Sequence, residues 1–232
     1  MERLDLHNHT DRSYDAVNRL EDYERAYGER RFDVLAITDH NRIDGALDLA
    51  ARATFPVIVG MEIDTADGEL IGLFLSEAIP PGLAAEETAA RIRGQGGLVY
   101  LQHPFYRLIR KPLQSPTRER LVDAHLLDIV EGRNGGPFTG RPDRIARAWA
   151  TERGLLIGAG SDAHEPADIG RCTVAVPEGP LTAESVMARL REGLIVDHHR
   201  SSLAQLATKI RYRGVRQIAR RVAGEPRGRR LP

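Results

Sequence analysis

Short apolar runs rich in valine, isoleucine and leucine recur along the first 160 residues, and amphipathic stretches separate them. Their length and β-branched content are typical of buried strands. The runs are 4–6, 34–37, 57–59, 70–75, 98–101, 127–130 and 155–157. Strand, loop and helix therefore alternate about seven times. This alternation predicts an α/β fold built on a parallel sheet, either open and doubly wound or closed into a barrel.

Helix start and stop signals lie between the apolar runs. Asn18 with Glu21 resembles a capping box, and Pro116 and Pro142 each fit the first turn of a helix. Gly94 follows a periodic segment, as a helix stop does. The glycines at 94, 96 and 97 precede a strand instead of following one, which disfavours a dinucleotide-binding fold.

Composition and charge limit the class of protein. The chain has 232 residues, 41% hydrophobic and 28% charged, which suits one globular domain. The charged N-terminus and the absence of a long apolar run predict a soluble, cytoplasmic protein without a membrane span. The single cysteine, Cys172, excludes a disulfide framework and a thiolate metal site. Any metal is therefore expected on His, Asp and Glu.

The net charge of zero conceals an asymmetry between two parts of the chain. Residues 200–232 contain ten Arg or Lys and one acid, which leaves 23 bases and 32 acids in residues 1–199. We expect 1–199 to form the barrel or sheet and 200–232 to form a basic amphipathic helix and tail. Leu203, Leu206 and Ile210 have the spacing of a helix packed on the domain. The alternative is an arm that contacts nucleic acid or an acidic membrane surface.

Most of the apolar runs end in a residue that can bind a metal ion. These residues are His7, His9, His40, Glu62, His103, Glu131, Asp162 and His164. In parallel α/β folds the carboxyl ends of the strands meet at one rim, where functional groups collect. His7 and His9 are two residues apart, so on an extended strand both point the same way. Imidazole and carboxylate ligands suit Zn, Mn or Fe, and their number predicts two or three divalent ions.

These motifs together resemble those of the polymerase and histidinol phosphatase (PHP) family. The motifs are His7-Asn8-His9-Thr10, Ile37-Thr38-Asp39-His40, Gly60-Met61-Glu62-Ile63, His103-Pro104 and Ser161-Asp162-Ala163-His164. The resemblance runs from about residue 3 to residue 199. It implies a distorted (β/α)7 TIM-like barrel with a trinuclear metal centre that hydrolyses phosphoesters.

The resemblance also implies how the ligands divide among the ions. The implied groups are His7, His9, Glu62 and Asp162 for the first ion, Glu62, His103 and Glu131 for the second, and Asp15, His40 and His164 for the third. Other family members often have histidine at the positions of Glu131 and Asp15. These two positions therefore leave open whether two or three ions bind, and whether the second is Mn or Fe instead of Zn.

The implied activity is that of a phosphatase or phosphodiesterase acting on a small phosphorylated substrate or a short nucleotide. Two close divalent ions would lower the pKa of a bridging water and neutralise a bound phosphate. Glu62 would bridge the ions, and Asp162 and His164 would orient the nucleophile or move a proton. Four arginines near the motifs are candidates to bind the phosphate, with Arg133 the best placed. They are Arg12, Arg107, Arg133 and Arg171.

Two other functions compete with this interpretation. Amidohydrolases also place a His-x-His motif on a barrel, but similar ones often bridge their metals with a modified lysine. The only lysines here, Lys111 and Lys209, follow no strand exit. A non-enzymatic metal-binding module would be expected to lack ligands, whereas nine positions retain them. Residues without a strand-exit context are interpreted as surface or structural, namely His125, His198, His199 and Glu69.

Overall fold

All seven predicted strands correspond to strands in the computed structural model, which describes residues 1–106, 111–136 and 140–197. The strands are β1 (Glu2–Asp5), β2 (Val34–Ile37), β3 (Val57–Thr65), β4 (Gly68–Leu73), β5 (Leu98–Leu101), β6 (Ile129–Asn134) and β7 (Leu156–Gly160). Two further strands, β8 (Cys172–Val176) and β9 (Leu194–Asp197), complete a sheet in the order β7-β6-β5-β4-β3-β2-β1-β8-β9. Sequence reasoning did not predict these last two strands.

The sheet curls until its first strand meets its seventh. The Leu6 amide donates to the Ala159 carbonyl at 3.1 Å, and the Asp162 amide donates to the His7 carbonyl at 2.7 Å. Asn8 and Ala163 form a parallel bridge just beyond β1 and β7. The result is a nearly closed, distorted TIM-like barrel, with β8 and β9 paired antiparallel on the outer side of β1. The predicted barrel is thereby confirmed, and the open sheet is excluded.

The distortion lies at β4, which runs antiparallel to both of its neighbours. β3 and β4 form a hairpin, with Thr65 paired to Gly68 across the turn. Gly68 has φ 128°, a conformation that favours glycine, so the Asp67-Gly68 pair was a turn signal in the sequence. The expected strand-helix-strand crossover is therefore wrong at this point. Because β4 is reversed, its first residues lie at the rim where β3 and β5 end.

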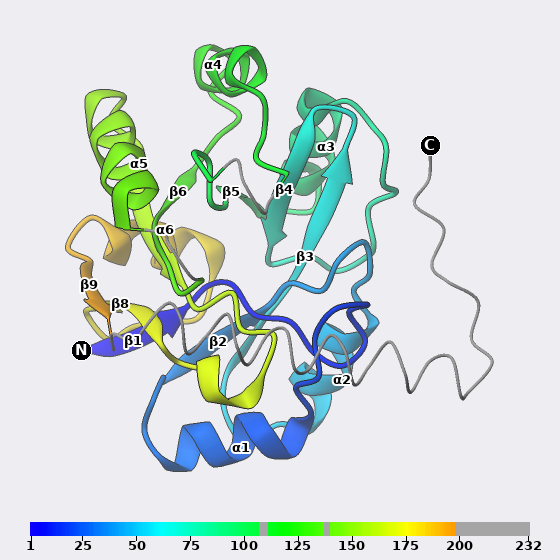
Figure 1. The fold of residues 1–232 in the computed structure, drawn as a ribbon, viewed down its shortest axis with the longest axis vertical. Helices are drawn as coiled ribbons and strands as arrows, with labels where there is room; N and C mark the ends of the chain where they lie inside the picture. The colour runs from blue at the N-terminus through cyan, green and yellow to red at the C-terminus, as the bar shows by residue number, and fades with distance from the viewer. Residues whose placement is uncertain (107–110, 137–139, 198–232) are drawn as a thin grey trace.

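Helices cover the outside of the barrel (Figure 1). They are α1 (Leu20–Gly28), α2 (Asp44–Arg52), α3 (Ala85–Gly94), α4 (Ser115–Asp123), α5 (Gly140–Glu152) and α6 (Ala183–Leu190), with a 3-10 turn at Pro166–Asp168. At the start of α1 the Asp22 carboxylate accepts from the Arg19 amide at 3.0 Å, so the capping contact lies one residue later than predicted. Asn18 instead donates to the carbonyls of His9 (3.0 Å) and Ala163 (2.9 Å). It therefore ties together two of the strand-exit loops.

The core divides into the barrel interior and two outer layers. Leu4, Leu6, Ile58, Ile71 and Tyr100 are among the buried side chains of the interior. One outer cluster includes residues of α3, α4 and α5, and the other includes residues of α1 and α2. These two helix groups lie on opposite sides of the barrel in Figure 1. Both faces of the barrel wall are thus packed, as the continuous apolar runs predict.

Arg133 on β6 connects three elements. Its guanidinium donates to Asp143 of α5 at 2.6 Å and to Asp197 of β9 at 2.6 Å. The Arg133 side chain is only 14% exposed, and burial raises the pKa of Asp143 to about 6 although Arg133 acts to lower it. Arg133 therefore holds β9 and α5 against the barrel, which accounts for the arginine without a bound phosphate.

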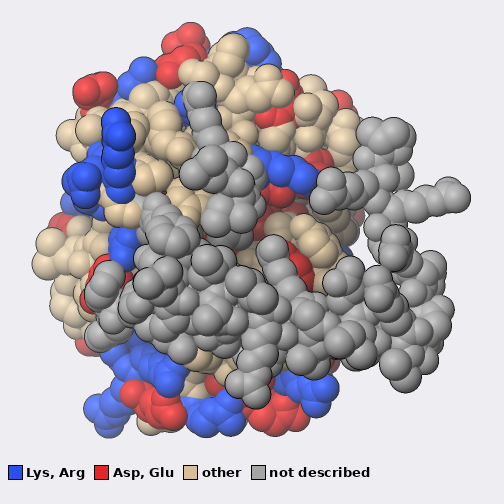
Figure 2. All heavy atoms as spheres, viewed as in Figure 1, with Lys and Arg blue, Asp and Glu red and all other residues tan. Residues whose placement is uncertain are grey.

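No helix in the described part of the chain is long and apolar enough to cross a membrane. Acidic and basic side chains are interspersed on the visible described surface (Figure 2). The predicted helix and tail at 200–232, and Arg107, lie outside the described residues.

Gly158 provides a test of barrel packing. A Cβ added there would lie 2.9 Å from Tyr100 Cε2 and 3.1 Å from both Leu6 Cδ1 and Ile129 Cγ2. We expect Gly158→Ala to destabilise the fold by about 1–3 kcal/mol through overpacking, measured by urea unfolding. Gly94→Ala is the matched control, because nothing lies within 4 Å of its added Cβ. Equal stability of the two variants would contradict the packing described.

Arg133 provides a second test. Arg133→Ala leaves the carboxylates of Asp143 and Asp197 without this cation, and we expect a loss of about 1–3 kcal/mol in the free energy of unfolding. Arg91→Ala is the control, because Arg91 forms an exposed pair with Glu87 within α3. Its loss should cost below about 1 kcal/mol. If both variants unfold at the same urea concentration, Arg133 does not hold these elements together.

Candidate metal centre

Four predicted ligands gather from the ends of β1 and β7 and from within β3. His7 Nε2 lies 3.4 Å from Glu62 Oε2 and 3.7 Å from Asp162 Oδ1. His9 Nε2 lies 3.3 Å and 3.5 Å from the same two oxygens. The two histidine Nε2 atoms are 3.1 Å apart. All four side chains are buried, so the structure brings together the whole group predicted for the first ion.

Glu62 lies at the centre of this arrangement. Its Oε2 faces His7 and His9, and also His40 Nδ1 at 3.3 Å. Its Oε1 lies 3.3 Å from His103 Nε2 and accepts a hydrogen bond from Gln102 Nε2 at 2.9 Å. A carboxylate with different nitrogen ligands at its two oxygens has the arrangement of a bridging ligand. This geometry agrees with the bridging position predicted for Glu62.

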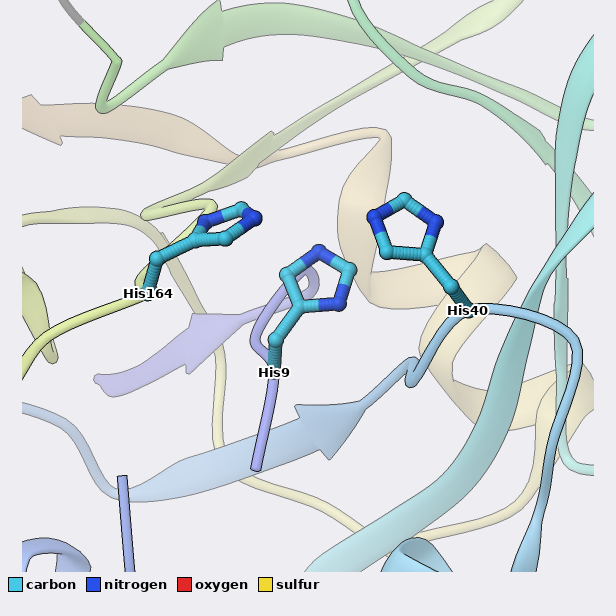
Figure 3. A group of neighbouring side chains, drawn as sticks. All are labelled: His9, His40 and His164. Atoms are coloured by element: carbon cyan, nitrogen blue, oxygen red, sulfur yellow. The ribbon is translucent and has the colours of Figure 1, made fainter. Parts of the chain in front are cut away.

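The imidazoles of His9, His40 and His164 form a second group beside the first. His9 lies between His40 and His164, with ring centroids 4.7 Å and 4.5 Å away (Figure 3). Asp15 Oδ2 joins them, 3.1 Å from His164 Nε2 and 3.6 Å from His40 Nε2. The Oδ1 atom of Asp15 is buried and has no hydrogen-bond partner. The three residues predicted for a third ion, Asp15, His40 and His164, are thus brought together.

Strained backbone positions two of the ligands. His103 has φ 31° and Asp162 has φ 48°, both in the left-handed region. Each such residue costs about 1–3 kcal/mol, so the surrounding structure must hold it. The His103 amide donates to Glu131 Oε2 at 2.8 Å, and the Asp162 amide donates to the His7 carbonyl. Two of the six described non-glycine residues with positive φ are thus candidate ligands at strand exits.

Charges within the cluster shift the ionisation of its members. Burial acts to raise the pKa of Glu62, but His40 and His7 hold it well below the usual value. Burial acts to lower the pKa of His40, but Glu62 and Asp15 raise it to about 10. Burial lowers the pKa of His164 to about 4. Glu62 is therefore ionised and His40 protonated at neutral pH, and a divalent ion displaces that proton when His40 binds it.

Glu131 does not lie with the ligands of the second ion. Its Oε1 is 3.0 Å from His7 Nδ1 and accepts from the Tyr100 hydroxyl at 3.2 Å. Its Oε2 accepts from the His103 amide and from Asn134 Nδ2, both at 2.8 Å. Four donors thus surround the carboxylate, and Glu131 belongs to none of the described groups that could hold an ion. Direct metal binding by Glu131 stays a prediction, and the hydrogen bonds described here give the residue a second possible role.

The contact with Glu131 has a consequence for His7. An ionised carboxylate only accepts hydrogen bonds, so Nδ1 of His7 must carry the proton. The Nε2 lone pair then faces Glu62 and Asp162. Gly160 allows this approach, because a Cβ there would lie 2.3 Å from His7 Cβ and 2.9 Å from Glu131 Oε1. Metal-binding histidines commonly donate the N–H of their other ring nitrogen to a carboxylate, which is the position of Glu131 relative to His7.

The predicted phosphate-binding arginines are not brought to the cluster. Arg133 binds Asp143 and Asp197, as described above. Arg171 is buried and pairs with Asp168 at 3.4 Å. Arg12 is exposed and lines a separate hollow of about 170 Å³ with Arg19 and Arg52. Phosphate binding by these three residues stays a prediction.

Sequence reasoning missed three polar residues of the centre. Gln102 and Asn134 donate to Glu62 and Glu131, and both are buried. Glu69 was interpreted as a surface or structural residue, yet it is buried and close to His40 and Glu62. Gln102 directly precedes His103, so its place at a strand exit was a usable signal. Glu69 is the second residue of the reversed strand β4. In a purely parallel sheet the first residues of a strand lie at the opposite rim, so the sequence pattern offered no reason to choose Glu69 as a ligand.

The donor chemistry of the cluster fits divalent metal ions. Three groups of potential ligands in the described chain contain at least two histidines, and two of these groups also contain a carboxylate. In each group the ligand atoms lie within 4.8 Å of one another. These groups are His9, His40 and His164; His7, His103 and Asp162; and His7, His9 and Glu62. Nitrogen and oxygen ligands without sulfur suit Zn, Mn or Fe.

Comparison with known proteins agrees with this geometry. The PHP domain family matches residues 5–130, and the PHP-associated family matches residues 140–195. Two uncharacterized proteins of Methanocaldococcus jannaschii are similar in sequence. One is 36% identical over 62% of this chain and 88% of its own length. The other is 33% identical over 76% of this chain and 71% of its own length.

Solved structures share the fold at lower identity. PsfC from Pseudomonas syringae is 18% identical, with a TM-score of 0.68 over 93% of this chain and 99% of that one. Another is a two-domain protein from Bacteroides vulgatus, described as containing a predicted PHP-like metal-dependent phosphoesterase. It is 18% identical with a TM-score of 0.66, and the match covers 85% of this chain and 65% of that one.

Endonuclease Q, solved with a duplex that contains an abasic lesion, is 16% identical with a TM-score of 0.63, and 82% of this chain covers 56% of it. At such identities these structures inform on the fold alone. The family match covers more than half of the chain and includes the strand exits that carry most of the cluster. The chain belongs to the PHP domain family, and its barrel has the fold of these solved structures.

Proposed function

We propose that this protein is a metal-dependent hydrolase of phosphate esters that uses two or three divalent ions. The observation that carries the proposal is the position of Glu62. Its two oxygens face different sets of histidines within one buried cluster. Such a carboxylate can bridge two ions held close together, and paired ions are typical of phosphoester hydrolysis.

The residues of the cluster would divide the ions among them. His7, His9, Glu62 and Asp162 would hold one ion, and His103 would join Glu62 at a second. Asp15, His40 and His164 would hold a third if three bind. When bound, such ions supply positive charge for the phosphate oxygens and lower the pKa of a coordinated water.

The remaining groups would position the reactants. Asp162 Oδ1 lies 3.3 Å from His164 Nδ1, and both side chains stand at the exit of β7. We assign to this pair the orientation of the attacking water. Arg133 and Arg171 are paired with carboxylates, so we propose that the positive charge at the site would come chiefly from the ions. The proposed substrate is a small phosphorylated molecule or a short nucleotide.

An amidohydrolase reaction is less well supported. Lys111 is 65% exposed and lies 2.9 Å from Asp64, so it does not lie between the metal-ligand groups. A modified lysine bridging two ions would have to come from outside the described residues, where Lys209 lies. We therefore do not propose this activity.

Metal analysis combined with a panel of phosphoesters tests the proposed function. We expect the purified protein to contain two or three equivalents of Mn, Fe or Zn and to hydrolyse at least one phosphomonoester or phosphodiester. Asp162→Ala should lower kcat at least about 100-fold, because the ions and the water lose a positioning group. Asp48→Asn, at a partly exposed acid on α2 that pairs with Arg52, is the control. A metal-loaded protein that hydrolyses cyclic amides and no phosphoester would reject the proposal.

Glu131 is proposed to orient His7 without binding an ion. Glu131→Gln keeps the size of the side chain but replaces one acceptor oxygen by a donor, so donors on that side lose their partner. We expect every ion to remain while the affinity falls about 10–100-fold. Tyr100→Phe removes one of the four donors and should weaken binding less. Complete loss of one ion from Glu131→Gln, measured by mass spectrometry of the metals, would identify Glu131 as a direct ligand.

A further inference from the structure

The reversed strand β4 places Glu69 at the metal-binding rim. In the β3–β4 ladder Glu69 pairs with Asp64, and Glu62 pairs with Ile71. Glu62 and Asp64 point to the same face of β3, so Glu69 shares that face and is the diagonal neighbour of Glu62. Long side chains reach one another across such a diagonal. Glu69 is only 5% exposed.

Glu69 belongs to a group of potential ligands and is the one member that the proposed function does not use. His40, Glu62 and Glu69 each offer one ligand atom, and these atoms lie within 4.8 Å of one another. We propose that Glu69 and Glu62 bind a further divalent cation, with Glu69 as a direct ligand, and that His40 joins them when it does not ligate an ion beside Asp15. This inference rests on the proposed function, because it shares Glu62 and His40 with the metal centre.

The charges around Glu69 support a cation at this position. Its carboxyl group is buried beside Glu62 and opposite Asp64, an unfavourable placement for a negative charge. Lys111 Nζ is 3.9 Å from Glu69 Oε1 but only 2.9 Å from Asp64 Oδ1, so the lysine mainly neutralises Asp64. A bound cation relieves the repulsion between Glu69 and Glu62.

The orientation of His40 separates this position from the one beside Asp15. Nδ1 of His40 faces Glu62 at 3.3 Å, whereas Nε2 faces Asp15 at 3.6 Å. A neutral imidazole has one free lone pair, so His40 cannot ligate ions on both sides at once. The cation beside Glu69 is therefore held mainly by two carboxylates. Oxygen-rich ligation favours Mn²⁺ or Mg²⁺ and gives weaker binding than the histidine-rich groups.

Titration of the metal-free full-length protein with Mn²⁺, followed by the electron paramagnetic resonance signal of free Mn²⁺, tests this proposal. We expect the wild-type protein to bind one weak ion in addition to the tight ones. Glu69→Gln should weaken that ion at least about tenfold and keep the tight ions. Asp64→Asn removes the same charge from the same hairpin, at a residue outside the ligand group, and should retain the weak ion.

The outcomes separate this inference from the proposed function. If the wild-type protein binds no Mn²⁺ tightly, the proposed metal centre fails. If tight binding is present but Glu69→Gln leaves the weak ion unchanged, or if Asp64→Asn loses it equally, Glu69 is not a ligand. Circular dichroism and thermal unfolding establish that each variant is folded. Glu69→Ala provides a second variant if the amide disturbs the hairpin.

Discussion

The buried carboxylate of Glu62 is the constraint around which the site is organised. A carboxylate at 1% exposure is costly unless cations and donors surround it. Imidazoles of His7, His9, His40 and His103 meet it from the exits of three other strands, and Gln102 donates to it. These groups can meet only if the strands are brought to one rim. Closure of the barrel therefore brings together the groups that neutralise the charge of Glu62.

Other buried hydrogen bonds hold the loops that carry the ligands. Asp5 accepts from the Ser161 amide at 2.8 Å and from the Gly170 amide at 3.1 Å, which ties the loop after β7 to β1. Asp39 accepts from the Thr10 amide at 2.6 Å and so fixes the loop after His9. Asn18 joins these same two loops. The cluster therefore belongs to a framework that is rigid before any ion is considered.

Sequence reasoning located the strands and most of the ligands because both depend on local pattern. Apolar runs identify buried strands, and the exits of parallel strands must meet at one rim. His7, His40, His103 and Asp162 follow directly from this logic. The partners of long side chains do not, because they depend on the three-dimensional surroundings. The sequence could not indicate that Arg133 is occupied by Asp143 and Asp197, or that four donors surround Glu131.

The separation between Glu62 and Glu69 is set by the hairpin that joins β3 directly to β4. Elsewhere on the rim a helix and its loops separate one ligand-bearing strand from the next, so changes in loop length are absorbed outside the barrel. Here the ladder register alone sets the separation. Side chains on a strand alternate between faces, so one residue inserted into the turn, with the pairing shifted by one, would turn Glu69 away from Glu62. This part of the rim therefore tolerates substitution more readily than a change in length.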